Sequence, residues 1–123
     1  MNKELGVVLE LEDADAGTAT GHLDGTNYKG VILFIDATKV SGDGAGLTVT
    51  IKGVDKASGQ DYTLLSSASI TQAGFSTLSI YPGLGVTANV SANAILPPTW
   101  FVDAAVEGDA SEVSATISAA LIA

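Results

Sequence analysis

The sequence predicts an all-β protein, an antiparallel β-sandwich of seven or eight strands, and three observations lead to this prediction. Apolar and polar residues alternate over short segments such as residues 47–52 (LTVTIK) and 113–121 (VSATISAAL). This period of two is typical of strands with one buried face. Turn residues separate the segments roughly every ten residues, and 46% of the chain is hydrophobic, enough for one core. The spacing leaves open whether the topology is jelly-roll or immunoglobulin-like.

The first elements predicted are an edge strand and a short second strand. Leu5, Val7 and Leu9 alternate with other residues and are expected on one face, and the acidic residues after them suit an edge. The chain is expected to form a single domain, residues 1–123, in which residues 1–11 are an N-terminal arm or edge strand. As an arm, this segment would reach a neighbouring subunit and add a strand to its sheet. Residues 18–22 (TATGH) are expected to form the second strand.

The central segment, residues 27–65, predicts three strands joined by two hairpin turns. Residues 31–35 (VILFI) are a continuous apolar run, which is typical of a strand buried on both faces. Residues 41–46 (SGDGAG) and 55–60 (DKASGQ) are rich in residues that favour turns, so each is predicted to reverse the chain. In the third strand Tyr62 and Leu64 are expected to share one face.

The C-terminal part predicts further strands. Residues 75–81 form one that Pro82 and Gly83 stop. Residues 86–95 are expected to form a loop with one helical turn. Residues 99–106 and the final alternating segment are predicted to be a hairpin that turns at residues 107–110 (EGDA).

Composition and charge exclude several classes of partner. The net charge is −9, from fourteen acidic residues against five lysines and no arginine. Nucleic acids and anionic membranes require a basic surface, so neither is expected as a partner. The acidity favours solubility or, alternatively, an acidic face that meets a basic partner. No apolar run approaches the ~20 residues of a spanning helix, and the N-terminus lacks the features of a secretory signal, so synthesis in a cytoplasm is expected.

No catalytic, cofactor or metal site is expected. His22 is the only histidine, cysteine is absent, and the acidic residues 10–15 lack the spacing of a calcium loop. The glycine-rich residues 41–46 lack the following helix and Lys-Ser/Thr pair of a phosphate-binding loop. The chain is therefore not expected to be an enzyme.

Two aromatic residues are candidates for contacts. Trp100 is expected to plug the core at one end of the sandwich, and the alternative is an exposed indole that binds a sugar or a protein. Tyr81 precedes Pro82 and is a candidate corner residue. The interface candidates are therefore Leu5, Val7, Leu9, Tyr81 and Trp100.

Several segments, taken in their order, resemble a family of small structural proteins of tailed bacteriophages. They are GVILFIDATKVSGDGAGLTVTIKGVD, SGQDYTLL, the YPGL step and LPPTW, and the match spans roughly residues 19–122. One departure is Pro98, where a basic residue is expected in the family's pattern.

The resemblance implies a virion component, and a capsid decoration (cement) protein suits a small acidic β-domain without cysteine. Such a protein would bind the exterior of the phage head as a homotrimer and stabilise contacts between major capsid protein subunits. The alternatives are a tail or head–tail component and a non-catalytic carbohydrate-binding module.

Overall fold

The computed structural model describes residues 3–22, 28–55, 57–83, 85–97 and 99–122, without the side chains of residues 3–5 and 110. The all-β prediction is confirmed, since no described residue lies in a helix. Accordingly, the described chain offers no helix of the length and apolarity needed to cross a bilayer. The strands are β1 (Lys3–Ala14), β2 (Gly17–Gly21), β3 (Gly30–Val54), β4 (Asp61–Ser66), β5 (Gly74–Ile80), β6 (Ser91–Ala92) and β7 (Trp100–Ile122).

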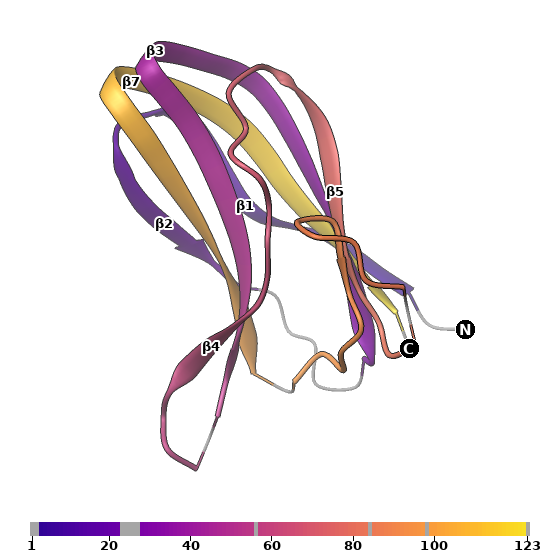
Figure 1. Ribbon diagram of the computed structural model, residues 1–123. Coiled ribbons are helices and arrows are strands. Elements are labelled where there is room, and N and C mark those ends of the chain that lie inside the picture. The colour runs from indigo at the N-terminus through magenta and orange to yellow at the C-terminus, as the bar shows by residue number, and fades with distance from the viewer. Residues whose placement is uncertain (1–2, 23–27, 56, 84, 98, 123) are drawn as a thin grey trace.

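Two long strands organise the molecule. β3 has 25 residues and β7 has 23, and they pair antiparallel from Gly30–Ile122 at one end to Gly53–Trp100 at the other. Both strands bend near the middle, so that each contributes one half to each of two layers (Figure 1).

The remaining strands complete the two layers. The first layer has the order β1, C-terminal half of β7, N-terminal half of β3, β5, and the short β6 adds to β5 in parallel. The second has the order β2, N-terminal half of β7, C-terminal half of β3, β4. Apart from the β3–β4 hairpin and the short β6, successive strands and half-strands alternate between the two layers, which is the jelly-roll arrangement. The pairing decides between the two topologies that the sequence left open.

Two of the three predicted reversals are wrong. Residues 41–46 and 107–110 are not hairpin turns but lie opposite each other at the bend, where Asp43 pairs with Asp109 and Gly46 with Glu107. Positive φ angles at Gly42, Gly44 and Gly108 let the two strands bend without reversing, and register shifts take up the extra residues. The turn at residues 55–60 is confirmed as a hairpin, because Val54 pairs with Asp61.

The core lies between the two layers. The predicted alternation is confirmed on both long strands, where every second side chain is buried: Leu47, Val49 and Ile51 on β3, and Val113, Ala115, Ile117, Ala119 and Leu121 on β7. Residues 31–35 depart from the prediction of two buried faces. Val31, Leu33 and Ile35 are fully buried, whereas Ile32 and Phe34 are half-buried on the outer side.

Two bulges shift the faces predicted for the shorter strands. In β1 the register slips between Val7 and Leu9, so Val8 is buried and Val7 is 56% exposed. The predicted common face of Val7 and Leu9 is therefore wrong, since a bulge adds one residue and changes the alternation. A slip between β3 and β4 likewise buries Leu65, while Tyr62 is 45% exposed and Leu64 is half-buried.

The segment between β5 and β7 is mostly irregular. The backbone N–H groups of Val90 and Ser91 donate to the carbonyl of Thr87, each over 3.0 Å, and form a turn. β6 follows directly, so the described part of residues 86–95 contains this turn and a two-residue strand.

Candidate interaction surfaces

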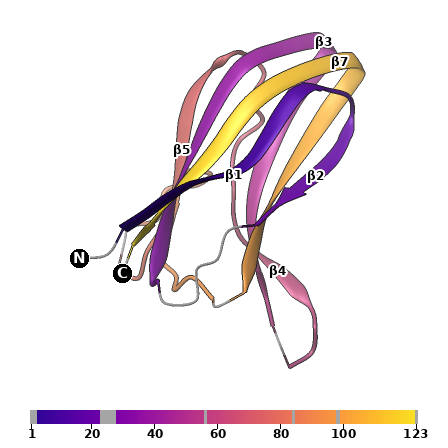
Figure 2. The same ribbon diagram turned by 180° about the vertical axis from the view of Figure 1, so that it is seen from behind.

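The N-terminal segment is built into the sheet of its own chain. β1 is the terminal strand of the first layer and pairs with β7 from Lys3–Ile122 to Ala14–Val113 (Figure 2). Residues 3–14 thus do not form a free arm.

The predicted interface residues are placed very differently. Val7 is exposed, Leu9 packs against the core, and the side chain of Leu5 lies outside the described part. Trp100 is only 3% exposed, so it plugs the core as expected and offers no surface to a partner. Tyr81 is half-buried, and its ring lies against Gly30, where a Cβ would be 2.6 Å from Tyr81 Cδ2.

The outer side of the first layer has an uncharged centre of apolar and hydroxyl side chains, here named the first outer face. It consists of two rows across the strands, Val7–Ser118–Phe34–Thr77 and Ala120–Ile32–Ser79, and of Phe75 at one end. Phe75 is 65% exposed, and its ring stacks on that of Phe34 with centroids 6.1 Å apart. Small side chains on β7 and β5 flank the larger ones on β3, so the face has ridges and shallow grooves.

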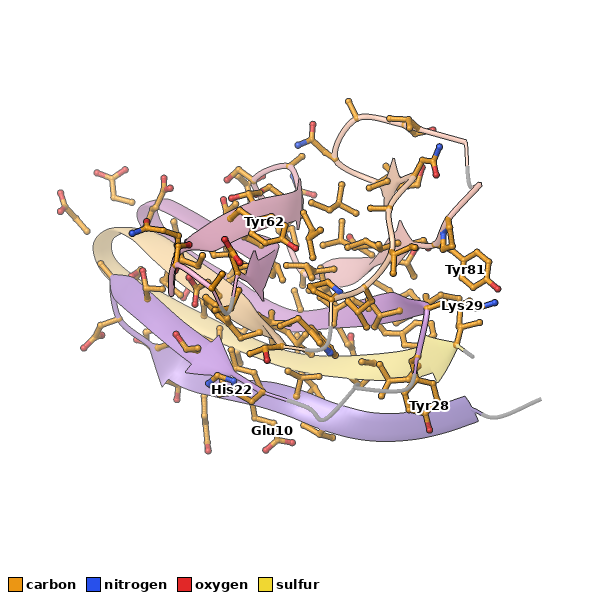
Figure 3. The ribbon with its side chains drawn as sticks, turned by 90° about the horizontal axis from the view of Figure 1, so that it is seen from below. Glu10, His22, Tyr28, Lys29, Tyr62 and Tyr81 are labelled. Carbon is orange, nitrogen blue, oxygen red and sulfur yellow. The ribbon has the colours of Figure 1, made fainter. Side chains whose placement is uncertain are left out.

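One of these grooves lies at the end of the first outer face opposite Phe75. It has a volume of about 290 Å³ and is lined mainly by apolar atoms of Ile32, Ser79, Ile80, Tyr81 and Ile122. Figure 3 shows that Tyr81 and Lys29 point outward in the same direction at this end of the molecule.

Charged residues lie at the two ends of the first outer face. The row Glu10–Thr116–Asp36 lies beside Phe75, since Asp36 pairs directly with Phe75 in the ladder. Lys29 precedes β3 at the opposite end and is exposed. None of these three charged residues forms an ion pair within the part of the chain that the structure describes.

The outer side of the second layer, here named the second outer face, is polar, and its side chains bind one another. Asp103 accepts a hydrogen bond from Thr20 Oγ1 over 2.8 Å and forms an ion pair with Lys52 Nζ over 3.4 Å. The hydroxyls of Thr50 and Ser66 are hydrogen-bonded over 2.8 Å. These contacts pair five polar side chains of this face within the chain.

The structure brings no catalytic constellation together among the described residues. His22 is exposed, and its ring lies 5.9 Å from that of Phe101 on β7. No group of three or more histidine, aspartate and glutamate side chains in the described ranges is arranged to hold a metal ion. A pocket of about 570 Å³ lies between residues 67–72, β5 and residues 89–90, and neither charged nor aromatic side chains line it.

An exposed cluster of charges ties three strands together near the bend. Lys39 Nζ lies 2.8 Å from Glu112 Oε2 and 3.1 Å from Asp13 Oδ1. The hydrogen bond to Glu112, followed by that to Asp13, raises the pKa of Lys39 above its ordinary value of 10.5. Asp13 has a φ of 45°, an unusual value for a residue other than glycine.

Phe34 and Phe75 lie on the surface although the sequence did not predict them there. The alternation contained the signal for Phe75, because it lies an odd number of residues from the buried Leu78. The exposure of Phe34 could not be predicted, because residues 31–35 are all apolar and the pattern there does not separate the two faces of the strand.

The sequence matches no protein-family model and none of the curated proteins. Among solved structures, a chain from the structure of infectious bursal disease virus, Gx strain, is similar to this one with a TM-score of 0.49 and 12% sequence identity. The match covers 98% of this chain and 32% of the other, so this chain spans about a third of that chain's length. A likeness at this level does not carry a function from one protein to the other.

Proposed function

We propose that the chain is a virion structural protein, namely a capsid decoration protein of a tailed bacteriophage. The observation that carries this proposal is the first outer face, a broad uncharged surface on a chain of net charge −9. Exposed apolar surfaces of this kind mark sites of protein–protein contact. A protein that acts by binding needs such a face, whereas catalysis needs a constellation of reactive groups.

The segments that resemble the phage family support the proposal. The longest of them, residues 30–55, comprises β3, and LPPTW leads into β7, so the resemblance concerns the two strands that join the layers. Jelly-roll domains occur in viral capsids, lectins and cupins. Because one fold serves several functions, the fold alone does not choose among them. The proposal of a capsid protein therefore depends on the phage-like segments and on the first outer face.

In this function the protein acts by adding contact area. It binds the exterior of the phage head as a trimer, as the resemblance implies. There it stabilises junctions between major capsid protein subunits. A specific interface of roughly 1,600 Å² holds such a junction closed, and many copies multiply the effect. The function requires no enzymatic activity, cofactor, nucleic acid or membrane.

Cryo-electron microscopy of the virion that encodes the chain tests the proposal. The expected result is density for a jelly-roll domain of this size on the outer surface of the head. Heads that lack the protein are expected to lose DNA at a lower temperature, and purified protein is expected to restore them. Density in the tail alone would overturn the decoration function and favour a tail or head–tail component.

The carbohydrate-binding alternative loses the residue on which it depended. Trp100 is buried, so its indole provides no platform for a sugar ring. The pocket between residues 67–72 and β5 has no aromatic lining either. We therefore do not propose this function.

A further inference from the structure

We propose that the first outer face binds a second copy of this chain, with Phe75 of one copy inserted into the groove formed by Ile32, Ser79, Ile80, Tyr81 and Ile122 of the next. This inference goes beyond the proposed function, because it concerns association between two copies of the chain and not attachment to the head. It does not depend on any contact with the capsid.

The two parts of the contact have complementary shapes and lie on the same face. Phe75 projects with 65% of its surface exposed at one end, and the apolar groove lies at the other. Phe75 and Ser79 are four residues apart on β5, about 13 Å along a strand. Burial of an exposed aromatic side chain in an apolar groove is the typical centre of a stable interface.

The charges at the two ends of the face favour the same arrangement. Asp36 is the direct ladder partner of Phe75, and Glu10 lies in the same row, whereas Lys29 lies at the groove end. When Phe75 of one copy enters the groove of another, these carboxylates approach the Lys29 ammonium of that copy. The reverse arrangement, with like ends together, would place acidic rows against each other.

The neutral centre of the face explains why copies of so acidic a chain associate here. Two chains that each carry a net charge of −9 repel each other through most of their surfaces. The two central rows contain only alanine, serine, threonine, valine, isoleucine and phenylalanine. Both halves of the contact, and the charges that orient it, belong to one chain, so a second copy is the partner that they fit.

Sedimentation equilibrium of the full chain tests this inference with a matched pair of variants. Phe75→Asp is expected to raise the dissociation constant by about tenfold or more. Tyr62→Asp, which changes an aromatic residue on the second layer that is 45% exposed, is expected to change it by less than about twofold. Wild-type protein that stays monomeric to about 1 mM, or equal effects of the two variants, would overturn the inference. Circular dichroism shows whether each variant is folded.

Cysteine cross-linking provides a second measurement, in which the readout is the gain of a covalent product and not a loss of association. The chain has no cysteine, so a mixture of the single variants Phe75→Cys and Ser79→Cys is expected to form a covalent heterodimer under mild oxidation. A mixture of Tyr62→Cys and Ser79→Cys is the control. Equal yields of covalent heterodimer from the two mixtures would overturn the inference.

A charge exchange tests the orientation. Lys29→Glu is expected to weaken association several-fold at low salt, and addition of Asp36→Lys is expected to restore it. Failure of the second change to restore association would overturn the proposed orientation.

The test is independent of the capsid. If the copies associate through this face but do not bind heads, the decoration function fails and the inference stands. If a monomer binds heads, the inference fails and the decoration function stands.

Discussion

The two layers of this molecule bury equivalent inner faces but present very different outer faces. In each layer the inward side chains of β3 and β7 are almost completely buried in one core. On the second outer face, Thr20, Lys52 and Asp103 bind one another. On the first, Val7 and Phe75 are exposed, and the charges at its ends have no ion-pair partner among the described residues.

This difference between the outer faces indicates which of them is better suited to bind another protein. A polar face that satisfies its own hydrogen bonds gains little from a partner, because an interface would have to desolvate groups that are already paired. An uncharged apolar face gains free energy when it leaves water. The comparison therefore supports our proposal that the first outer face contacts a protein partner, while the second faces solvent.

The largest expected effect tests the equivalence of the inner faces. Leu33 and Leu47 are both fully buried, one in each layer. Their substitution by alanine is expected to lower the free energy of unfolding by about 2–5 kcal/mol each, through lost burial and the cavity that remains. Urea unfolding measures both. If one substitution cost little while the other was severe, the layers would not share one core.

The next effect concerns the bend that joins the layers. Gly108 has a φ of 113°, and a Cβ there would lie 2.7 Å from Ala45 Cα. Gly108→Ala is expected to cost about 2–3 kcal/mol, from an unfavourable backbone conformation and this clash.

Gly44 provides the matched control for the bend. It also has a positive φ, 71°, but a Cβ there would meet nothing within 4 Å. Gly44→Ala is expected to cost about 1 kcal/mol, the conformational part alone. Equal losses of stability in the two variants, measured by thermal unfolding, would show that close packing at the bend has no role.

A smaller effect tests the internal pairing of the second outer face. Asp103→Ala removes the acceptor shared by Thr20 and Lys52 and is expected to cost about 1–2 kcal/mol. Asp36→Ala, on the first outer face, is expected to leave monomer stability unchanged within about 0.5 kcal/mol. Chemical denaturation at low protein concentration measures the free energy of unfolding of both variants. A larger loss for Asp36→Ala than for Asp103→Ala would show that the first outer face, and not the second, is stabilised by contacts within the chain.

The smallest effect is the pH dependence of the charge cluster at the bend. The folded-state pKa of Lys39 is raised above 10.5, so its stabilising contribution is complete below that pH and is lost as the pH rises through the raised pKa. The wild type is thus expected to be slightly more stable than Lys39→Met near pH ~9, with the difference vanishing near pH ~12. Salt at ~1 M should also remove it, since these charges are exposed. A difference that is the same at both pH values would contradict this origin.

Much of the fold was predictable from alternation, because a strand with one buried face leaves a period of two in the sequence. The inward residues of β3 after the bend follow it, and so do those of β7 on either side of its bend, where the alternation changes phase. The faces of β1 and β4 were not predictable, since bulges at Val8 and Leu64 add a residue that no local pattern announces. Of the surface that we propose for contact, only Val7 and Tyr81 were among the interface residues predicted from the sequence. The partial exposure of Phe34 could not be predicted, because it depends on what covers β3.

The sequence by itself determined the fold class, the alternating core positions on either side of the bend and the acidic character. It favoured a buried Trp100 but left an exposed indole open, and the structure decided for burial. Only the tertiary structure decided the meaning of its glycine-rich connectors. Residues 55–60 reverse the chain, and Asp55 accepts a 2.7 Å hydrogen bond from Gly59 N–H. Residues 41–46 are similar in composition but lie opposite residues 107–112 of β7. With a partner strand continuous on both sides of them, the two segments bend together, and a predicted pair of hairpins becomes the bend between two layers.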